Sequence, residues 1–410
     1  MPTPTVMMAE LTDLRQDLDS FLASFDPCIS TRPSRKHLRT YVGGQTGPLE
    51  RKSIEPIALE SEVAPRTLQE FLEIHRWDHE AVRRRVQELV MERHADPSAI
   101  GVIDESGMPK KGRHTLGVQR QYCGATGKQD NCVVSVHLGY VTDTFATLVD
   151  GDVFLPEEWC NDPVRRAAAG VPLTLGFRTK LEIGLDLVDR ARASGVTFTY
   201  FTADALYGRS AVFREGLTQR GYLYVVEIPR DLSGWRILPA LETGPRGGQH
   251  LALGAVEARP AETYWLRGGP PWQRFVIKET EKGPVVWEVR QAPFWAWKQG
   301  LPGPPEQLLV ARNPMDGQLK YFLTNADASV PLTTLLRVAF GRAEIEHLFE
   351  VAKGEVGLDH FEVRKYLPLQ RHLILSMVSQ LFLMEAFTRL RGKKSLVECR
   401  PSPCSRRGAA

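Results

Sequence analysis

The sequence is poor in cysteine, and its cysteines are not spaced as in a zinc site. Six cysteines are spread over 410 residues, and none of them forms a C-x-x-C pair. The pattern therefore indicates neither a zinc centre nor a disulfide framework. Scattered single cysteines in a long chain are typical of a reducing compartment, so we expect a cytoplasmic protein.

Long apolar runs and an export signal are also missing. The N-terminal stretch MPTPTVMMAELTDL has no basic segment followed by an apolar core, and it does not predict a signal peptide. The most apolar stretch, residues 373–387, is too short to span a bilayer and is interrupted by Ser376, Gln380 and Glu385. We expect a buried core helix there, and no membrane partner.

A strong excess of one charge is absent as well. The formal net charge is only +3, which does not by itself require a nucleic-acid partner. The basic residues are clustered, however, and local clusters on a near-neutral protein suit contacts with phosphate. The alternative interpretation of any single cluster is a solvated helix face. The clusters are Arg32 to Arg39, Arg51 and Lys52, Arg83 to Arg85, Lys110 to Arg113, and the C-terminal residues.

What is present is an ordinary globular composition, with 42% apolar and 25% charged residues, over a length that suggests two or three domains. The first part has helical periodicity, and two short helices meeting near Pro65 favour a helix-turn-helix. Apolar strand-like runs then alternate with amphipathic helices, which predicts an α/β sheet flanked by helices. A Trp- and Gly-rich part with short strand-like runs follows, and helices then resume. The predicted divisions are an N-terminal helical domain (1–98), a first core part (99–232), a β-rich insertion (233–325), a second core part (326–390) and a basic, disordered tail (391–410).

Three acidic residues stand out because each lies on a different predicted element. Asp104 ends the apolar run AIGVID, Asp204 ends VTFTYFTAD, and Glu346 lies in a helical segment. Ligands of α/β sheets usually bind at the ends of strands. Carboxylates that converge there can hold hard cations such as Mg²⁺ beside a phosphate. The structural alternatives are a turn residue for Asp104, a helix N-cap for Asp204 and a surface ion pair for Glu346.

The segment around Glu346 also carries basic residues at helical spacing. Arg342, Glu346, Phe349 and Lys353 share one face of the predicted helix, at the border of its apolar stripe. Other acids and histidines nearby are weaker candidates: Glu105 would point to the opposite strand face from Asp104, and Glu350 breaks the spacing. We interpret the histidines as ordinary polar residues, because oxygen ligands suit Mg²⁺ better. The candidates set aside are Glu105, Glu344, Glu350, His114, His347, His360 and His372.

Several motifs together resemble the DDE transposases of bacterial insertion sequences. They are IDESGMPKKG around Asp104, GVQRQYCGATGKQDNC after it, TADALYG around Asp204, and an R-x-x-x-E-x-x-x-x-x-x-K pattern from Arg342 to Lys353. The last pattern is similar to the Y-R-E-K signature of one branch, which inserts a β domain before the glutamate. The resemblance implies an α/β, RNase H-like core with a mixed sheet, interrupted by that insertion. It also implies that Asp104, Asp204 and Glu346 are catalytic and hold two Mg²⁺ ions, or Mn²⁺ in their place.

The same resemblance implies the substrate. Arg342, Lys353, Lys110 and Lys111 would contact phosphates of double-stranded DNA. The reaction would be cleavage at terminal inverted repeats and strand transfer into target DNA by a homodimer at the nucleoid, with a hairpin intermediate expected for this branch. An exposed tryptophan of the insertion would stack on a flipped base, while we expect most of its tryptophans to be core residues.

One departure from the signature bears on activity. The tyrosine of Y-R-E-K is expected at position 339, where this chain has Ala339, so the role of that tyrosine does not transfer. Two alternatives therefore stay open. One is a catalytically silent, DNA-binding relative of a transposase. The other is an RNase H-like nuclease that cuts DNA without joining it.

Overall fold

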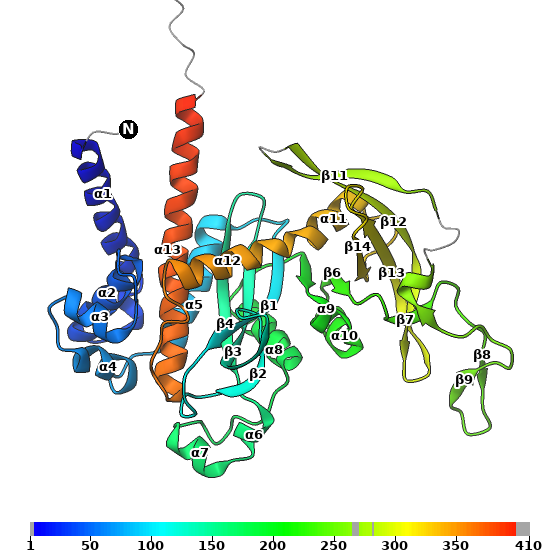
Figure 1. Cartoon of the computed structure of the whole chain (residues 1–410), viewed down its shortest axis with the longest axis horizontal. Helices are drawn as coiled ribbons and strands as arrows, with labels where there is room; N and C mark the ends of the chain where they lie inside the picture. Colours follow the sequence, from blue (N-terminus) through cyan, green and yellow to red (C-terminus); the bar gives the residue numbers. More distant parts are fainter. Residues whose placement is uncertain (1–3, 265–269, 281–282, 399–410) are drawn as a thin grey trace, which may run out of the picture.

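The structure is a computed structural model that describes residues 4–264, 270–280 and 283–398 (Figure 1). Its N-terminal part is helical, as the periodicity predicts. The helices are α1 (Pro4–Ala23), η1 (Asp26–Cys28), α2 (Arg32–Thr46), α3 (Ile54–Glu60), α4 (Pro65–Glu73) and α5 (His79–His94).

Local signals explain where these helices begin. The side chain of Asp78 accepts a hydrogen bond from the Ala81 N–H at 3.0 Å and so caps α5, which explains the break in periodicity near Trp77. Pro65 occupies the first turn of α4, where its missing N–H costs nothing. The helices α3 and α4 pack against each other, as expected for two short helices that meet at this proline.

The next part forms the mixed sheet that the sequence predicts. Its strands lie in the order β4-β3-β1-β5-β6, antiparallel on the β3 side and parallel from β1 to β6. This mixed order is the arrangement expected of an RNase H-like core. The strands are β1 (Ile100–Pro109), β2 (Gln119–Cys123), β3 (Lys128–Val141), β4 (Ala146–Phe154), β5 (Tyr200–Ala203) and β6 (Leu223–Ile228).

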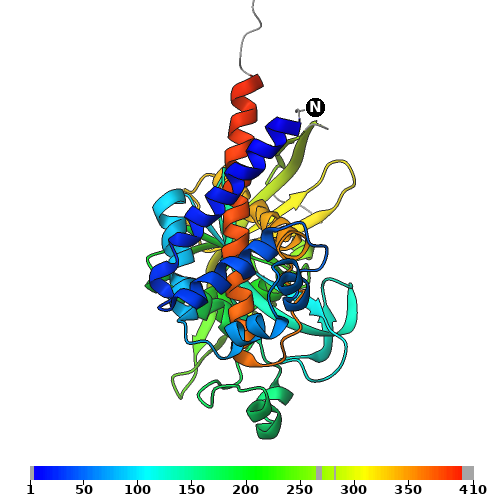
Figure 2. The same cartoon turned by 90° about the vertical axis from the view of Figure 1, so that its left-hand side faces the viewer.

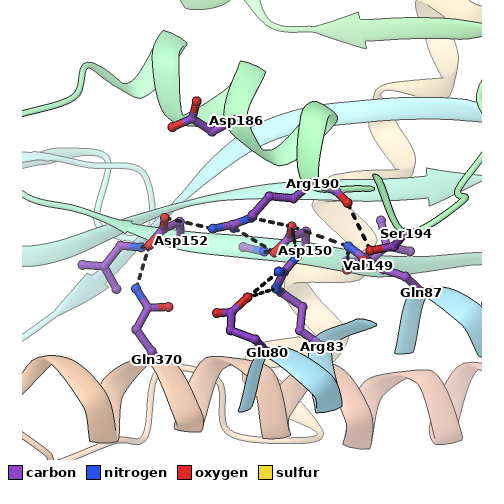
Figure 3. Close-up of polar contacts among 12 residues, drawn as sticks. Glu80, Arg83, Gln87, Val149, Asp150, Asp152, Asp186, Arg190, Ser194 and Gln370 are labelled. Carbon is purple, nitrogen blue, oxygen red and sulfur yellow. Dashed lines mark hydrogen bonds and ion pairs between the residues drawn. The ribbon is translucent and has the colours of Figure 1, made fainter. Parts of the chain in front are cut away.

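Helices cover both faces of this sheet. Helix α8 packs on β3 and β4 from one side, while α5, α12 and α13 contact β4 from the other, an arrangement visible in Figures 1 and 3. The helices that follow β4 in the chain are α6 (Glu157–Cys160), α7 (Pro163–Ala168), α8 (Lys180–Ala193), α9 (Ala205–Gly208), α10 (Ala211–Gln219), α11 (Leu332–Gly341), α12 (Ala343–Gly354) and α13 (Tyr366–Glu398).

The Trp-rich part contributes strands to the same sheet. Strand β14 pairs antiparallel with β6, so the sheet continues from the core through β14, β13 and β12 (Figure 1). A separate hairpin, β8 with β9, extends to the side. The elements are β7 (Ser233–Trp235), β8 (Leu241–Thr243), β9 (Gln249–Leu251), β10 (Arg259–Pro260), η2 (Ala261–Tyr264), β11 (Gln273–Thr280), β12 (Gly283–Lys298), β13 (Leu301–Arg312) and β14 (Leu319–Thr324).

The tryptophans of this part differ in burial. Trp235 and Trp287 are buried, Trp272 and Trp295 are half-buried, and Trp297 is 52% exposed. Trp272 packs against the core, so three of the five described tryptophans agree with the expectation that most of them are core residues. Trp265 lies outside the described residues.

The apolar helix α13 is buried along much of its length, as expected for residues 373–387. By length and composition alone Tyr366–Leu390 is apolar enough to cross a membrane, but 61% of its most apolar window is buried in the protein. It packs on β4, α2 and α5. Near its middle, Phe382 contacts Phe21 at the C-terminal end of α1, which crosses α13 in the view of Figure 2. The helix continues to Glu398 rather than ending at residue 390, and the rest of the predicted tail lies outside the described residues.

Candidate active site

Strand register brings two of the three acids together. The parallel ladder between β1 and β5 ends with Ile103 beside Ala203, so Asp104 and Asp204 are the next residues along two neighbouring strands. Only Asp204 follows a strand end. Asp104 is in mid-strand, paired with His137, because β1 continues along β3 after β5 stops. The expectations that Asp104 ends its strand and that it is a turn residue are both wrong.

Asp204 begins a helix and faces the same site. Its Oδ1 accepts hydrogen bonds from the N–H groups of Leu206 at 2.9 Å and Tyr207 at 3.3 Å, which caps α9. The structural alternative for this residue is thus correct. It does not compete with a functional role, because the cap engages Oδ1 and fixes the orientation of the carboxylate.

Arg342, at the junction of α11 and α12, links the acids. Its guanidinium nitrogens lie 3.2 Å from an oxygen of Asp104, 3.0 Å from one of Glu346 and 3.6 Å from one of Glu227. The i,i+4 ion pair with Glu346 is therefore present. The same arginine, however, bridges carboxylates from β1, β6 and α12. The Glu346 side chain remains 61% exposed.

These residues line one cavity of about 410 Å³, which we call the carboxylate cavity. Every ionisable group around it is a carboxylate, a guanidinium or a phenol, and neither histidine nor cysteine lines it. Its lining residues are Asp104, Glu105, Gly107, Tyr122, Gly124, Asp204, Ala205, Glu227, Arg342 and Glu346.

The cavity is short of positive charge. Burial, and after it the charge of Asp204, raise the pKa of Asp104 to about 7, although the Glu105 N–H and Arg342 partly oppose this rise. Desolvation and a like charge nearby both disfavour the ionised carboxylate. A cation between Asp104 and Asp204 would relieve this repulsion.

The donor atoms fit a hard divalent cation better than a soft one, since carboxylate oxygens are its preferred ligands. In the described part of the chain no three Asp, Glu, His or Cys side chains are close enough together to hold a metal ion. Glu346 instead pairs with Arg342, which lies between it and Asp104. The residue types therefore fit the ion, and the side chain of Glu346 would have to turn towards the aspartates.

The three predicted lysines lie outside the cavity lining. The Lys353 ammonium donates to the Gly107 carbonyl at 3.1 Å, and burial lowers its pKa. Lys110 donates to the carbonyls of Asp359 at 2.7 Å and Phe361 at 2.8 Å, and burial lowers its pKa to about 8. These contacts favour a structural role for Lys110, whereas Lys111 is exposed to solvent.

The three competing acids have other surroundings than the three predicted catalytic acids. Glu105 pairs with Lys180 of α8 at 2.7 Å, which agrees with the opposite-face prediction, although it also borders the cavity. Glu344 lies 3.8 Å from Lys278, and Glu350 is 80% exposed beside His347. None of the four histidines considered lines the cavity.

Sequence reasoning missed two residues of the cavity, Glu227 and Tyr122. Glu227 is the single acid in the apolar strand run YLYVVEIP, a signal that was available. Tyr122 lies in the motif GVQRQYCGATGKQDNC, where alternation along the strand distinguishes it from the buried Cys123. The signature position Ala339 is buried in α11 and does not line the cavity.

Comparison with known proteins agrees with this geometry. Residues 24–266, more than half of the chain, match the family described as "DDE superfamily endonuclease". The chain belongs to this family. The match includes Asp104 and Asp204 and ends before Glu346, whose assignment therefore depends on its place in the cavity.

One relative of this chain has a name that states a biological role. The "Probable transposase for insertion sequence element IS701" of Microchaete diplosiphon is 35% identical to this endonuclease-family chain over 164 residues. The match covers 39% of this chain and 40% of that protein, so it spans less than half of either.

Proposed function

We propose that this chain is a transposase that cleaves DNA at transposon ends and joins them to a target, with divalent metal ions as cofactors. Membership of the DDE endonuclease family supports the cleavage chemistry, and the named relative supports transposition as its use. The observation that carries the proposal is the convergence of Asp104, Asp204 and Glu346 on one cavity.

Asp104, Asp204 and Glu346 would hold the metal, which we propose to be two Mg²⁺ ions or Mn²⁺. Two such ions activate an attacking oxygen and stabilise the leaving oxygen of an in-line displacement at phosphorus. Asp204 is oriented for this by its cap on α9. Asp104 is held by the pairing of β1 with β3, and its neighbour Ile103 is the last β1 residue to pair with β5.

Arg342 would act on the substrate and on the acids. Its contacts with Asp104, Glu346 and Glu227 offset the repulsion among the carboxylates. A guanidinium also binds phosphate oxygens in bidentate geometry. We propose that Arg342 moves from Glu346 to a DNA phosphate when substrate enters, and that Glu227 keeps the guanidinium near the cavity.

Water would hydrolyse the phosphodiester at the transposon end and leave a 3′-hydroxyl. That hydroxyl would then attack a phosphodiester of the target, so that one bond forms as another breaks. The N-terminal helices α3 and α4 would recognise the terminal inverted repeat. Pairing of two ends would require a homodimer during the reaction.

The test uses the full-length protein with Mg²⁺ and duplexes that carry the inverted repeats flanking its gene. We expect nicked and joined products from the unmodified protein. Glu346→Gln should lower the cleavage rate by about a hundredfold or more, because it removes a charge from the metal site. Glu350→Gln is the matched control on the same helix, and it should cleave normally because its side chain faces solvent.

The products separate the alternatives. Binding of the repeats without cleavage in any divalent metal would indicate a silent DNA-binding relative. Nicked DNA without joined product would indicate a nuclease that does not transfer strands. Equal rates for Glu346→Gln and the unmodified protein would contradict the proposed site.

A further inference from the structure

The hairpin of β2 and β3 presents an aromatic and a basic side chain beside the carboxylate cavity. Exposure alternates along β2, so Arg120 and Tyr122 share its outward face while Cys123 is buried. Tyr122 is 56% exposed and also lines the cavity together with Asp104 and Asp204. The phenol ring of Tyr122 is therefore accessible to a ligand and lies next to the acids.

The hairpin is held firmly in this place. Its inward face packs through Cys123 and Cys132 against Val134 and Phe154. It also lies so close to β1 that a Cβ added at Gly107 would come 2.9 Å from the Cys123 Sγ and 3.3 Å from the Gly124 nitrogen. Because Gly107 and Asp104 are on the same strand, the position of Tyr122 relative to the acids is fixed by the fold.

The charge of this face suits phosphate. Arg120 is exposed on the outward face of β2. The residues opposite Arg120 and Tyr122 on β3 are Asn131 and Gln129, both uncharged. The outward face of the hairpin is thus basic and aromatic, whereas the cavity beside it is acidic.

We propose that this face binds unpaired nucleotides of the DNA strand that enters the carboxylate cavity. Tyr122 stacks on a base and Arg120 binds a backbone phosphate, the combination by which proteins hold single strands. Bases in an intact duplex are already stacked on each other, so the site selects an opened end. This inference rests on the proposed function for the identity of the ligand.

The test measures binding to two labelled probes in EDTA, where no cleavage occurs. One probe is a blunt duplex, and the other is the same duplex with a short unpaired 3′ end. Tyr122→Leu should weaken binding of the open-ended probe about tenfold and leave the blunt probe within about twofold. Tyr122→Phe and Tyr122→Trp should bind the open-ended probe as tightly as the unmodified protein, since both retain a stacking face.

Arg120 is tested by salt dependence. Arg120→Gln should lower the slope of log affinity against log salt by about 0.7 for the unpaired end. Arg246→Gln is the matched control, because Arg246 is an exposed arginine in the β8–β9 hairpin. It should leave the slope unchanged.

The inference is overturned if Tyr122→Leu binds both probes like the unmodified protein, or if it weakens both equally. It is also overturned if Tyr122→Trp fails to restore binding. Failure of the proposed function looks different: the unmodified protein would still prefer the open-ended probe through Tyr122, yet it would not cleave either probe when Mg²⁺ is supplied.

Discussion

Asp204 and Arg342 each combine a structural and a functional position in one side chain. The carboxylate of Asp204 caps α9 and also borders the carboxylate cavity. Arg342 makes an ordinary i,i+4 pair with Glu346 and also reaches Asp104 across the site. A local interpretation of either residue is therefore accurate but incomplete, since the second role depends on neighbours far away in the sequence.

Another residue with a defined environment is His372, a buried residue of α13 that contacts Tyr41 of α2. Its Nε2 donates to the Leu358 carbonyl at 3.0 Å, and its Nδ1 accepts from the Tyr41 hydroxyl at 2.8 Å. Burial lowers its pKa to about 4. The neutral ring is thus the folded form.

We predict that acid destabilises the fold through this histidine. The unfolded chain takes up a proton near pH 6.5 and the folded chain only near pH 4. The contribution of His372 to the free energy of unfolding should therefore be constant above about pH 6.5. As the pH falls from about 6.5 to about 4, this contribution should decrease by up to about 1.4 kcal/mol per pH unit.

The measurement is urea unfolding at several pH values. His372→Gln should reduce the slope of stability against pH in this window, and the exposed His114→Gln should not. An unchanged slope in His372→Gln would contradict the prediction.

At the scale of elements, close packing between α9 and β6 holds the site together. Gly208, the last residue of α9, lies against the β6 backbone, where an added Cβ would be 1.9 Å from the Glu227 carbonyl oxygen. Backbone cannot move aside as a flexible side chain can. The same contact therefore positions both Asp204, at the start of α9, and Glu227, on β6.

We predict that Gly208→Ala destabilises the protein by roughly 1–3 kcal/mol, because it overpacks this junction. It should also reduce cleavage more than the loss of stability explains, since α9 carries Asp204. Gly354→Ala is the control: Gly354 also ends a helix, and an added Cβ would meet nothing within 4 Å. Chemical denaturation and cleavage assays measure the two effects, and a Gly208→Ala variant as stable and active as the control would refute the prediction.

At the scale of the whole molecule, a buried charge network joins the N-terminal helices, the core sheet and α13 (Figure 3). Asp150 of β4 accepts from Arg83 of α5 at 3.1 Å and from Arg190 of α8 at 2.9 Å. Asp152 of the same strand accepts from Gln370 of α13 at 2.6 Å. Elements distant in sequence are thus tied to one strand by charge-assisted hydrogen bonds.

We predict that Asp150→Asn destabilises the protein by roughly 1–3 kcal/mol, because it removes the buried carboxylate that Arg83 and Arg190 share. The two arginines keep Glu80 and Asp152 as their second partners. Asp189→Asn is the control, since it removes the partner of Arg220 at the surface, and it should cost less than about 1 kcal/mol. Urea unfolding compares the two variants. Equal costs would show that burial of the network adds nothing.

The sequence by itself determined the types of the elements and the family resemblance. Apolar periodicity and the alternation of apolar runs with amphipathic segments are local signals, and they predicted the N-terminal helices and an α/β sheet flanked by helices. The DDE resemblance came from short motifs, each formed by residues close together in the sequence, and the family match confirms it.

Only the tertiary structure decided which side chains meet. The length of β5 relative to β1 decides that Asp104 is in mid-strand beside Asp204, and strand β6 adds Glu227 to the same cavity. The pairing of β14 with β6 likewise joins the inserted strands to the core sheet. Strand order arises from contacts between residues far apart in the chain, and local periodicity, which shows the two faces of a strand, does not show which strands are its neighbours.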